Sequence, residues 1–531
     1  MSDLPLVDHS AARADWRPAL ASALLAVALF AVTLNGTYIY DDLYVIGIDA
    51  RLRDPSQWGK YWTRDYFNGG VDNLYRPLVS MSYAIQWWLH GDRPWAYHAV
   101  NVVLHAMASG CVAELARRLA GTKPAYVAGL LFAAHPVHVE AVANVVGRAE
   151  LACGAAVTGA LVVFARRPLT IGRAVAVWAL LVCAVLSKEQ GLLLPLMLVA
   201  MHLLVRGRPR AFESHASGPD SSDERKGMRT LVLLVCWSMA SYIVFRESIL
   251  KFWWDRVFLD PTQNPMVEAH GRDRLLMPLV LFGRYVQLLF APYKLSIDYG
   301  GRVIGSVARL NDPYLWTGVA AAVAWCFAMA VALVRRNGPV AFCLLCFGMV
   351  YGLIGNIVTI IGTNFGERLM YLPSAFFLIL VGIALARLPR RALTAAMLIL
   401  LSLACVRTFT YTVRWNDRLA FLQSQVRTQP TSVRVHLLVA DEWMRRKEYA
   451  QADEVMARAR EVQPDYARAW EQSAAVALLL GDVDRAEALA RRAVEIDPIM
   501  GMSQIWKLIA ERRAATQPAT APTTSATSPA Q

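Results

Sequence analysis

Charged residues are scarce in this chain. Of its 531 residues only 18% are Asp, Glu, Lys or Arg, whereas 56% are hydrophobic. Soluble globular proteins carry about 25% charged residues. The deficit comes from long uncharged runs, each close to the roughly 20 residues that a helix needs to cross a bilayer. The sequence therefore predicts an all-α, polytopic membrane protein with about 10–12 spans. The clearest runs are 18–34, 98–116, 126–143, 151–165, 174–187, 189–205, 230–245, 314–334, 339–361, 369–386 and 392–410.

Cysteine is missing from the segments between these runs. All eight cysteines lie inside apolar runs, so no disulfide framework is expected. Cys343 and Cys346 have the spacing of half a zinc site. They lack a partner pair and lie in an uninterrupted hydrophobic segment, so we interpret them as small packing residues.

The net charge of +13 comes largely from basic clusters between the predicted spans. This distribution is typical of cytoplasmic loops in membrane proteins, so it does not indicate nucleic-acid binding. With every cluster in the cytoplasm the N-terminus is inside, and loop 36–97 and everything after Arg414 are on the non-cytoplasmic side. Segment 275–291 would invert this order if it crossed, so we predict that it is interfacial or re-entrant. The basic clusters lie within 117–123, 166–173, 206–229, 335–336 and 387–391.

After residue 414 the composition becomes charged and alanine-rich, and it repeats. Residues 448–466 align with residues 482–500 at an offset of 34, with Ala452 matching Ala486. A 34-residue period with small residues where the helices cross is typical of tetratricopeptide repeats. The sequence thus predicts a membrane domain over 1–414, a tetratricopeptide-repeat α-solenoid over 430–513 and a disordered Thr/Ala/Pro-rich tail over 514–531.

Charged and histidine residues gather in the predicted outer turns. Cations at a membrane surface can hold a lipid-linked phosphate, and a nearby carboxylate can take a proton from an attacking hydroxyl. The alternative for the charged residues is that they form structural ion pairs. For His98 and His105, which lie on one face of the second predicted span, the alternative is that they are ordinary interior histidines. A metal site at His135 and His138 with the acidic pair lacks a firm third ligand. These outer residues are Asp41, Asp42, Arg76, His135, His138, Arg148, Glu150, Lys188, Glu189, Glu367 and Arg368.

An ordered set of short motifs carries a family resemblance. An Asp-Asp pair after the first span is followed by "YRPL", "YH..N..LH", "HPVHVEAV…GRAEL", "SKE.G", "ERLMYLPS" and the repeats. Over about residues 35–500 the chain closely resembles the transmembrane and tetratricopeptide-repeat-containing O-mannosyltransferases, which are glycosyltransferases of the GT-C class. The resemblance implies transfer of mannose from a polyprenyl phosphate to Ser or Thr hydroxyls of a protein on the non-cytoplasmic side. It also implies an inverting reaction with no metal and no other cofactor.

Roles for the outer residues follow from that expected reaction. Asp41 or Asp42 would be the base, and the donor phosphate would be held by cations because its negative charge grows as the sugar leaves. The repeats would bind the acceptor protein or another partner. Two rivals remain: a membrane-anchored tetratricopeptide scaffold, and a ligase or polymerase for lipid-linked oligosaccharides. The expected phosphate ligands are Arg76, Arg148, Lys188 and Arg368, and the expected supporting residues are His135, His138, Glu150, Glu189 and Glu367.

Overall fold

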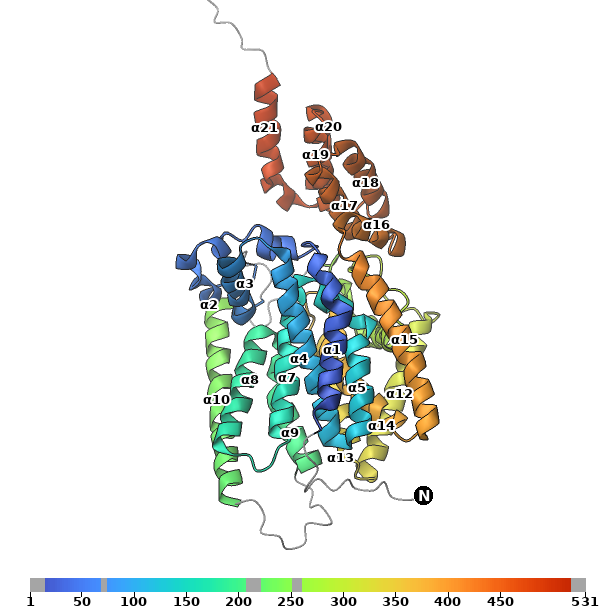
Figure 1. The fold of residues 1–531 in the computed structure, drawn as a ribbon. Coiled ribbons are helices and arrows are strands. Elements are labelled where there is room, and N and C mark those ends of the chain that lie inside the picture. Colours follow the sequence, from blue (N-terminus) through green and yellow to red (C-terminus); the bar gives the residue numbers. More distant parts are fainter. Residues whose placement is uncertain (1–14, 68–73, 207–220, 251–259, 517–531) are drawn as a thin grey trace, which may run out of the picture. The chain divides into compact units, whose positions relative to one another are not determined.

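A computed structural model describes residues 15–67, 74–206, 221–250 and 260–516. Within these ranges the chain forms helices and turns and no strand (Figure 1), which confirms the predicted all-α class. The chain divides into two compact units, Met1–Phe421 and Leu422–Gln531.

The first unit is a helix bundle. Helix α4 packs against α1, α5 and α7, and α5 also packs against α14. The helices are α1 (Arg17–Phe30), α2 (Lys60–Thr63), α3 (Pro77–His90), α4 (Pro94–Ala120), α5 (Thr122–Ala134), α6 (Val139–Ala143), α7 (Arg148–Phe164), α8 (Ile171–Ser187), α9 (Leu194–Met201), α10 (Ser221–Leu250), α11 (Gly271–Phe290), α12 (Pro313–Val334), α13 (Gly338–Ile354), α14 (Tyr371–Leu385) and α15 (Arg390–Arg414).

Short helical turns connect these helices and carry much of the polar sequence. They are η1 (Ala31–Asn35), η2 (Leu43–Gly47), η3 (Ala50–Arg53), η4 (Pro55–Gln57), η5 (Pro136–His138), η6 (Val145–Gly147), η7 (Glu189–Leu193), η8 (His202–Arg206), η9 (Pro265–Glu268) and η10 (Glu367–Met370).

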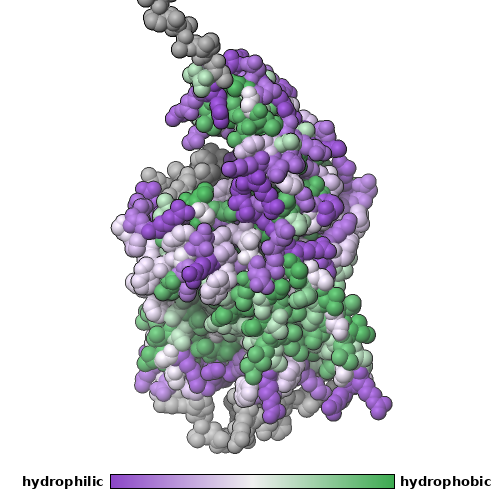
Figure 2. Space-filling model, turned by 45° about the horizontal axis from the view of Figure 1, so that its top comes forward, coloured by the Kyte–Doolittle hydropathy of each residue, from purple (hydrophilic) through white to green (hydrophobic). Residues whose placement is uncertain are grey.

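The apolar helices agree with a polytopic membrane protein. In the described part of the chain eight helices are long and apolar enough to cross a bilayer, and a bent pair makes up to nine. Two shorter apolar helices, Ile171–Ser187 and Gly338–Ile354, coincide with two further predicted spans. Figure 2 shows a band of hydrophobic surface on this unit with hydrophilic residues above and below it. Helix α11, which contains residues 275–290 of the segment 275–291, is not among the candidate spans.

The span expected over 126–143 is broken. Helix α5 ends at Ala134, and the segment Pro136–Ala143 continues at an angle of 48°. The break falls at His135, whose backbone is extended with φ −69° and ψ 126°. A residue before proline is disfavoured in the helical region because the proline ring clashes with it. Pro136 therefore separates the "HPVHVEAV" motif from the span that precedes it.

The second unit consists of antiparallel helix pairs. Helices α17 (Val433–Arg445) and α19 (Ala467–Leu479) begin 34 residues apart, as do α18 (Tyr449–Val462) and α20 (Val483–Ile496). The matched alanines Ala452 and Ala486 are fully buried. The helices thus recur with the period on which the tetratricopeptide prediction rests. The turn η11 (Pro498–Met502) and helix α21 (Gln504–Thr516) complete the second unit, while helix α16 (Arg418–Thr428) includes the boundary between the two units.

The predicted tail begins inside this last helix. Because α21 extends to Thr516, residues 514–516 are helical and not disordered as predicted. The rest of the tail, 517–531, lies outside the described residues, as do Arg208 and Arg210 of the predicted cytoplasmic cluster.

Candidate active site

Charged residues from six separate segments come together. They lie after η1, at the start of α3, on α6, on α7, at the junction of α8 and η7, and in η10. The sequence predicts all but one of them as site residues. We call this set the ionic cluster; its members are Asp41, Arg76, Glu140, Glu150, Lys188, Glu189 and Arg368.

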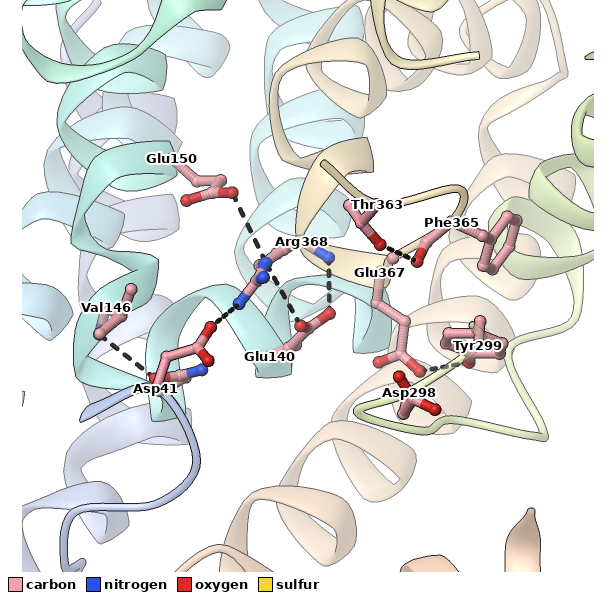
Figure 3. Close-up of polar contacts among 12 residues, drawn as sticks. Asp41, Glu140, Val146, Glu150, Asp298, Tyr299, Thr363, Phe365, Glu367 and Arg368 are labelled. Carbon is pink, nitrogen blue, oxygen red and sulfur yellow. Dashed lines mark hydrogen bonds and ion pairs between the residues drawn. The ribbon is translucent and has the colours of Figure 1, made fainter. Parts of the chain in front are cut away.

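Arg368 is the centre of the ionic cluster (Figure 3). Its Nη1 lies 3.3 Å from Oδ2 of Asp41, while its Nε lies 3.6 Å from Oε1 of Glu140 and 4.0 Å from Oε1 of Glu150. The backbone N–H of Arg368 also donates to Oε2 of Glu140 at 2.9 Å. One guanidinium therefore joins the first loop, α6 and α7 to the segment that begins α14.

The other two cations of the ionic cluster pair with carboxylates of other segments. The ammonium of Lys188 donates to Oε1 of Glu150, the oxygen that also faces Arg368. Arg76 Nη2 lies 3.0 Å from Oε2 of Glu189. Burial lowers the pKa of Lys188 despite the carboxylate of Glu150. Burial also acts to lower the pKa of Arg76. The negative charges of Glu189 and Glu150 outweigh this effect and raise the pKa of the guanidinium. Although adjacent in sequence, Lys188 and Glu189 are thus paired with different segments.

Asp41 is accessible to solvent, and it shares its cation, Arg368, with other carboxylates of the ionic cluster. Its side chain is 22% exposed and that of Arg368 is 21% exposed, whereas those of Glu140 and Glu150 are each 4% exposed. The side chain of Glu189 is also more exposed than those of Glu140 and Glu150, but Glu189 pairs with Arg76 and not with Arg368. Asp41 shares Arg368 with two buried carboxylates, so it is not needed alone to neutralise that cation. A reachable carboxylate in this position is suited to accept a proton.

Asp42 has the opposite environment. Its side chain is fully buried and accepts hydrogen bonds from the backbone N–H groups of Ile39 at 3.2 Å, Val145 at 3.2 Å and Val146 at 2.8 Å. These bonds tie the first loop to η6 at the start of α7. Asp42 therefore holds the loop in place, and of the predicted acidic pair only Asp41 contacts the ionic cluster.

Arg148 is not part of the ionic cluster, and its hydrogen-bond partners are neutral groups. It is buried, and it donates to Ser82 Oγ at 2.9 Å, to the carbonyl of Tyr97 at 3.1 Å and to Asn101 Oδ1 at 3.2 Å. Its guanidinium also lies 4.4 Å from the centre of the Tyr83 ring. These contacts occupy the group and join α3, α4 and α7. The geometry therefore does not favour the predicted role of Arg148 as a phosphate ligand.

The two predicted histidines, His135 and His138, are buried and make hydrogen-bond contacts with other groups of the protein. His135 Nε2 lies 3.0 Å from the carbonyl oxygen of Leu289, within hydrogen-bond distance. Its Nδ1 accepts a hydrogen bond from the backbone N–H of Val137. His138 contacts the carbonyl of Phe132 and Ser374 Oγ, both at 2.8 Å. Among the residues that the structure describes, no group of three or more His, Cys, Asp or Glu could hold a metal ion.

Glu367 turns away from its neighbour Arg368. Its carboxylate is buried and accepts from the N–H of Ser296 and from the hydroxyl of Tyr299 at 2.7 Å (Figure 3). It therefore anchors the loop between α11 and α12. The sequence places Glu367 in a turn between two helices, as the structure does, but it cannot show which way the side chain points.

Glu140 is the member of the ionic cluster that the sequence analysis does not single out. It stands in "HPVHVEAV", just after the break at Pro136, and it is 3% exposed. The available signal is a carboxylate in an otherwise apolar segment, because such a group is costly near lipid and is usually retained for a function.

Two motif glycines allow the turns of the ionic cluster to close. A Cβ on Gly147 would lie 2.1 Å from the carbonyl oxygen of Ala141, and one on Gly191 would lie 2.4 Å from the carbonyl carbon of Ala184. Both distances are far shorter than real contacts. Only glycine therefore lets η6 fold against α6, and η7 against the end of α8, where Lys188 follows.

The chain is similar in sequence to several protein O-mannosyl-transferases. It is 33% identical over 185 residues to protein O-mannosyl-transferase tmtc2 of Xenopus laevis, which covers 32% of this chain and 22% of that one. It is 25% identical over 463 residues to the human protein O-mannosyl-transferase TMTC4, which covers 78% of this chain and 62% of that one. These matches confirm the predicted resemblance to the transmembrane and tetratricopeptide-repeat-containing O-mannosyltransferases. The chain spans less than two thirds of the length of these relatives.

Two further comparisons add little. No family model matches the chain. Among solved structures, ArnT from Cupriavidus metallidurans bound to undecaprenyl phosphate is similar with a TM-score of 0.43 and 16% identity, over 90% of this chain and 77% of that one. A likeness of this strength decides neither fold nor ligand, so the GT-C class stays a prediction.

Proposed function

We propose that this protein is a glycosyltransferase of the membrane that transfers mannose or a similar sugar from a polyprenyl phosphate to Ser or Thr hydroxyls of an acceptor protein. The observation that carries the proposal is the ionic cluster. Its accessible side contains a carboxylate and a guanidinium 3.3 Å apart, which are the two groups that such a transfer requires. The names of the relatives support the sugar and the acceptor class.

In the proposed reaction Asp41 acts as general base. It takes the proton of the acceptor hydroxyl while the hydroxyl oxygen attacks the anomeric carbon of the sugar. The bond between that carbon and the phosphate oxygen breaks, and the phosphate leaves with the electron pair. A single displacement of this kind inverts the configuration at the anomeric carbon.

Arg368 is the proposed ligand of the leaving phosphate. Its Nε side is occupied by Glu140 and Glu150, so the accessible side of the guanidinium is the one near Asp41. Charge-assisted hydrogen bonds to phosphate are stronger than neutral ones, and they strengthen further as charge develops on the leaving group. Arg76 and Lys188 add positive charge nearby.

We further propose that the ionic cluster and the repeats are on the non-cytoplasmic side. Helix α7 supports this, because Glu150 of the cluster is near its start while Arg206 binds the carbonyls of Phe164 and Arg166 at its other end. Arg206 and Arg166 belong to the predicted cytoplasmic clusters. Helix α15 begins with the basic residues of another such cluster.

The proposal is tested by supplying the purified protein with radiolabelled sugars linked to polyprenyl phosphate and a mixture of peptides. Label that enters peptides and is released by β-elimination would support transfer to Ser or Thr. Label that enters lipid-linked oligosaccharide would instead support the ligase or polymerase alternative. No transfer from any donor would leave the scaffold alternative.

A further inference from the structure

Glu140 binds Arg368 in two ways at once. Its Oε2 accepts from the backbone N–H of Arg368 at 2.9 Å, and its Oε1 lies 3.6 Å from the side-chain Nε of the same residue. The two oxygens of one carboxylate therefore fix both the main chain and the guanidinium of Arg368.

The backbone around Glu140 is buried as well. Glu140 lies on α6, whose five residues are all buried and which follows the break at Pro136. A buried carboxylate is stable only if it is paired, because burial of an isolated charge is very costly. Glu140 and Arg368 satisfy this requirement for each other at one end of α6.

We propose that Glu140 is a positioning residue for the donor phosphate. By holding the Nε side of Arg368, it directs the Nη side toward Asp41, where the phosphate and the base must meet. The inference rests on the proposed function, because it assigns the substrate that the directed guanidinium binds. Glu140 itself touches neither the sugar nor the phosphate.

The test is a double-mutant cycle on the full-length protein, read out as binding of a polyprenyl phosphate in detergent. Glu140→Gln keeps an acceptor for the backbone N–H but turns its uncharged amide toward Nε. The expected result is about tenfold weaker binding, equivalent to about 1.4 kcal/mol. In an Arg368→Gln background the same substitution should change binding less than twofold, because residues that act through one contact are not additive.

The control is Glu114→Gln on α4, which removes a carboxylate that also binds two arginines, Arg117 and Arg118. This control should leave binding of the polyprenyl phosphate unchanged. If Glu140→Gln does not fold, Glu140→Asp enters the same cycle, since its shorter side chain keeps the charge and loses the reach to Nε.

Three outcomes overturn the inference, and one of them also overturns the proposed function. An equal loss in both backgrounds would mean that Glu140 acts independently of Arg368. Unchanged binding in Glu140→Gln would mean that Arg368 needs no positioning. If the wild-type protein does not bind a polyprenyl phosphate at all, both the proposed function and this inference fail, so the two failures are distinguishable.

Discussion

Asp41 and Asp42 show how two neighbouring residues of one type can have different roles. Asp41 faces a shared cation at the surface of the ionic cluster, whereas Asp42 is buried against three backbone N–H groups. Burial raises the pKa of Asp42 from its ordinary 3.8 to about 7, against the opposing effect of those N–H donors. The buried carboxyl group is therefore linked to the stability of the fold.

This linkage predicts a pH dependence of stability. A folded-state pKa above the unfolded value means that the native state binds the extra proton between about pH 4 and 7. The contribution of Asp42 is fully present below that range and is lost as the pH rises through about 7. We expect the melting temperature in detergent to fall between pH 5 and 8, and to fall less in Asp42→Asn. Parallel curves for the two proteins would show that Asp42 does not titrate in this range.

The sequence predicts most members of the ionic cluster but not their pairing. Charged residues at the ends of apolar runs stand out by composition, so Arg76, Lys188 and Arg368 are recognisable. Their partners depend on which way a side chain points after a tight turn, and Glu367 and Arg368 point in different directions. Glu140 is missed because the predicted span 126–143 runs through Pro136, although a proline at this point disfavours a continuous helix and its break brings Glu140 to the cluster.

At the scale of elements, Arg148 links three helices. It joins Ser82 on α3 to Tyr97 and Asn101 on α4, from the start of α7. Lysine carries one point charge and cannot reproduce the planar fork of arginine. We expect Arg148→Lys to lower the free energy of unfolding by about 1–3 kcal/mol, because a buried acceptor loses its donor.

Measurements on the Arg148→Lys protein can distinguish a structural role of Arg148 from a role in phosphate binding. At a temperature where Arg148→Lys is folded, binding of a polyprenyl phosphate should match that of the wild type. A large loss of binding with an unchanged melting temperature would restore Arg148 as a phosphate ligand. Thermal unfolding followed by intrinsic tryptophan fluorescence, beside the binding assay, provides both values.

The helices themselves are predicted well because span length and hydropathy are local properties. Most predicted runs coincide with an apolar helix, including the short ones α8 and α13, whereas the run 126–143 is broken at His135. The structure within loop 36–97 is not predicted: it contains α3 and several short turns. Such turns depend on contacts between distant segments, for example Arg51 with the carbonyl of Tyr66, and these contacts leave no periodic pattern.

At the scale of the whole molecule, the two units have separate cores. The second unit buries alanines and aliphatic residues of adjacent helices against one another, as repeats do. Deletion from residue 430 should therefore leave the membrane unit folded and able to bind a polyprenyl phosphate. We expect slow hydrolysis of the donor and poor transfer to protein. Loss of donor binding on truncation would mean that the repeats are part of the donor site.

The central claim is that Asp41 is the base of a glycosyl transfer. The most direct test compares transfer of radiolabelled mannose from a polyprenyl phosphate to peptide by wild type, Asp41→Asn and the control Asp54→Asn. Asp54 caps a turn of the same loop, and asparagine can also cap. General-base catalysis accounts for about 10²–10⁴ in rate. We predict a loss of that size in Asp41→Asn, with donor binding retained and Asp54→Asn unchanged. Turnover of Asp41→Asn within a few-fold of wild type would contradict the account.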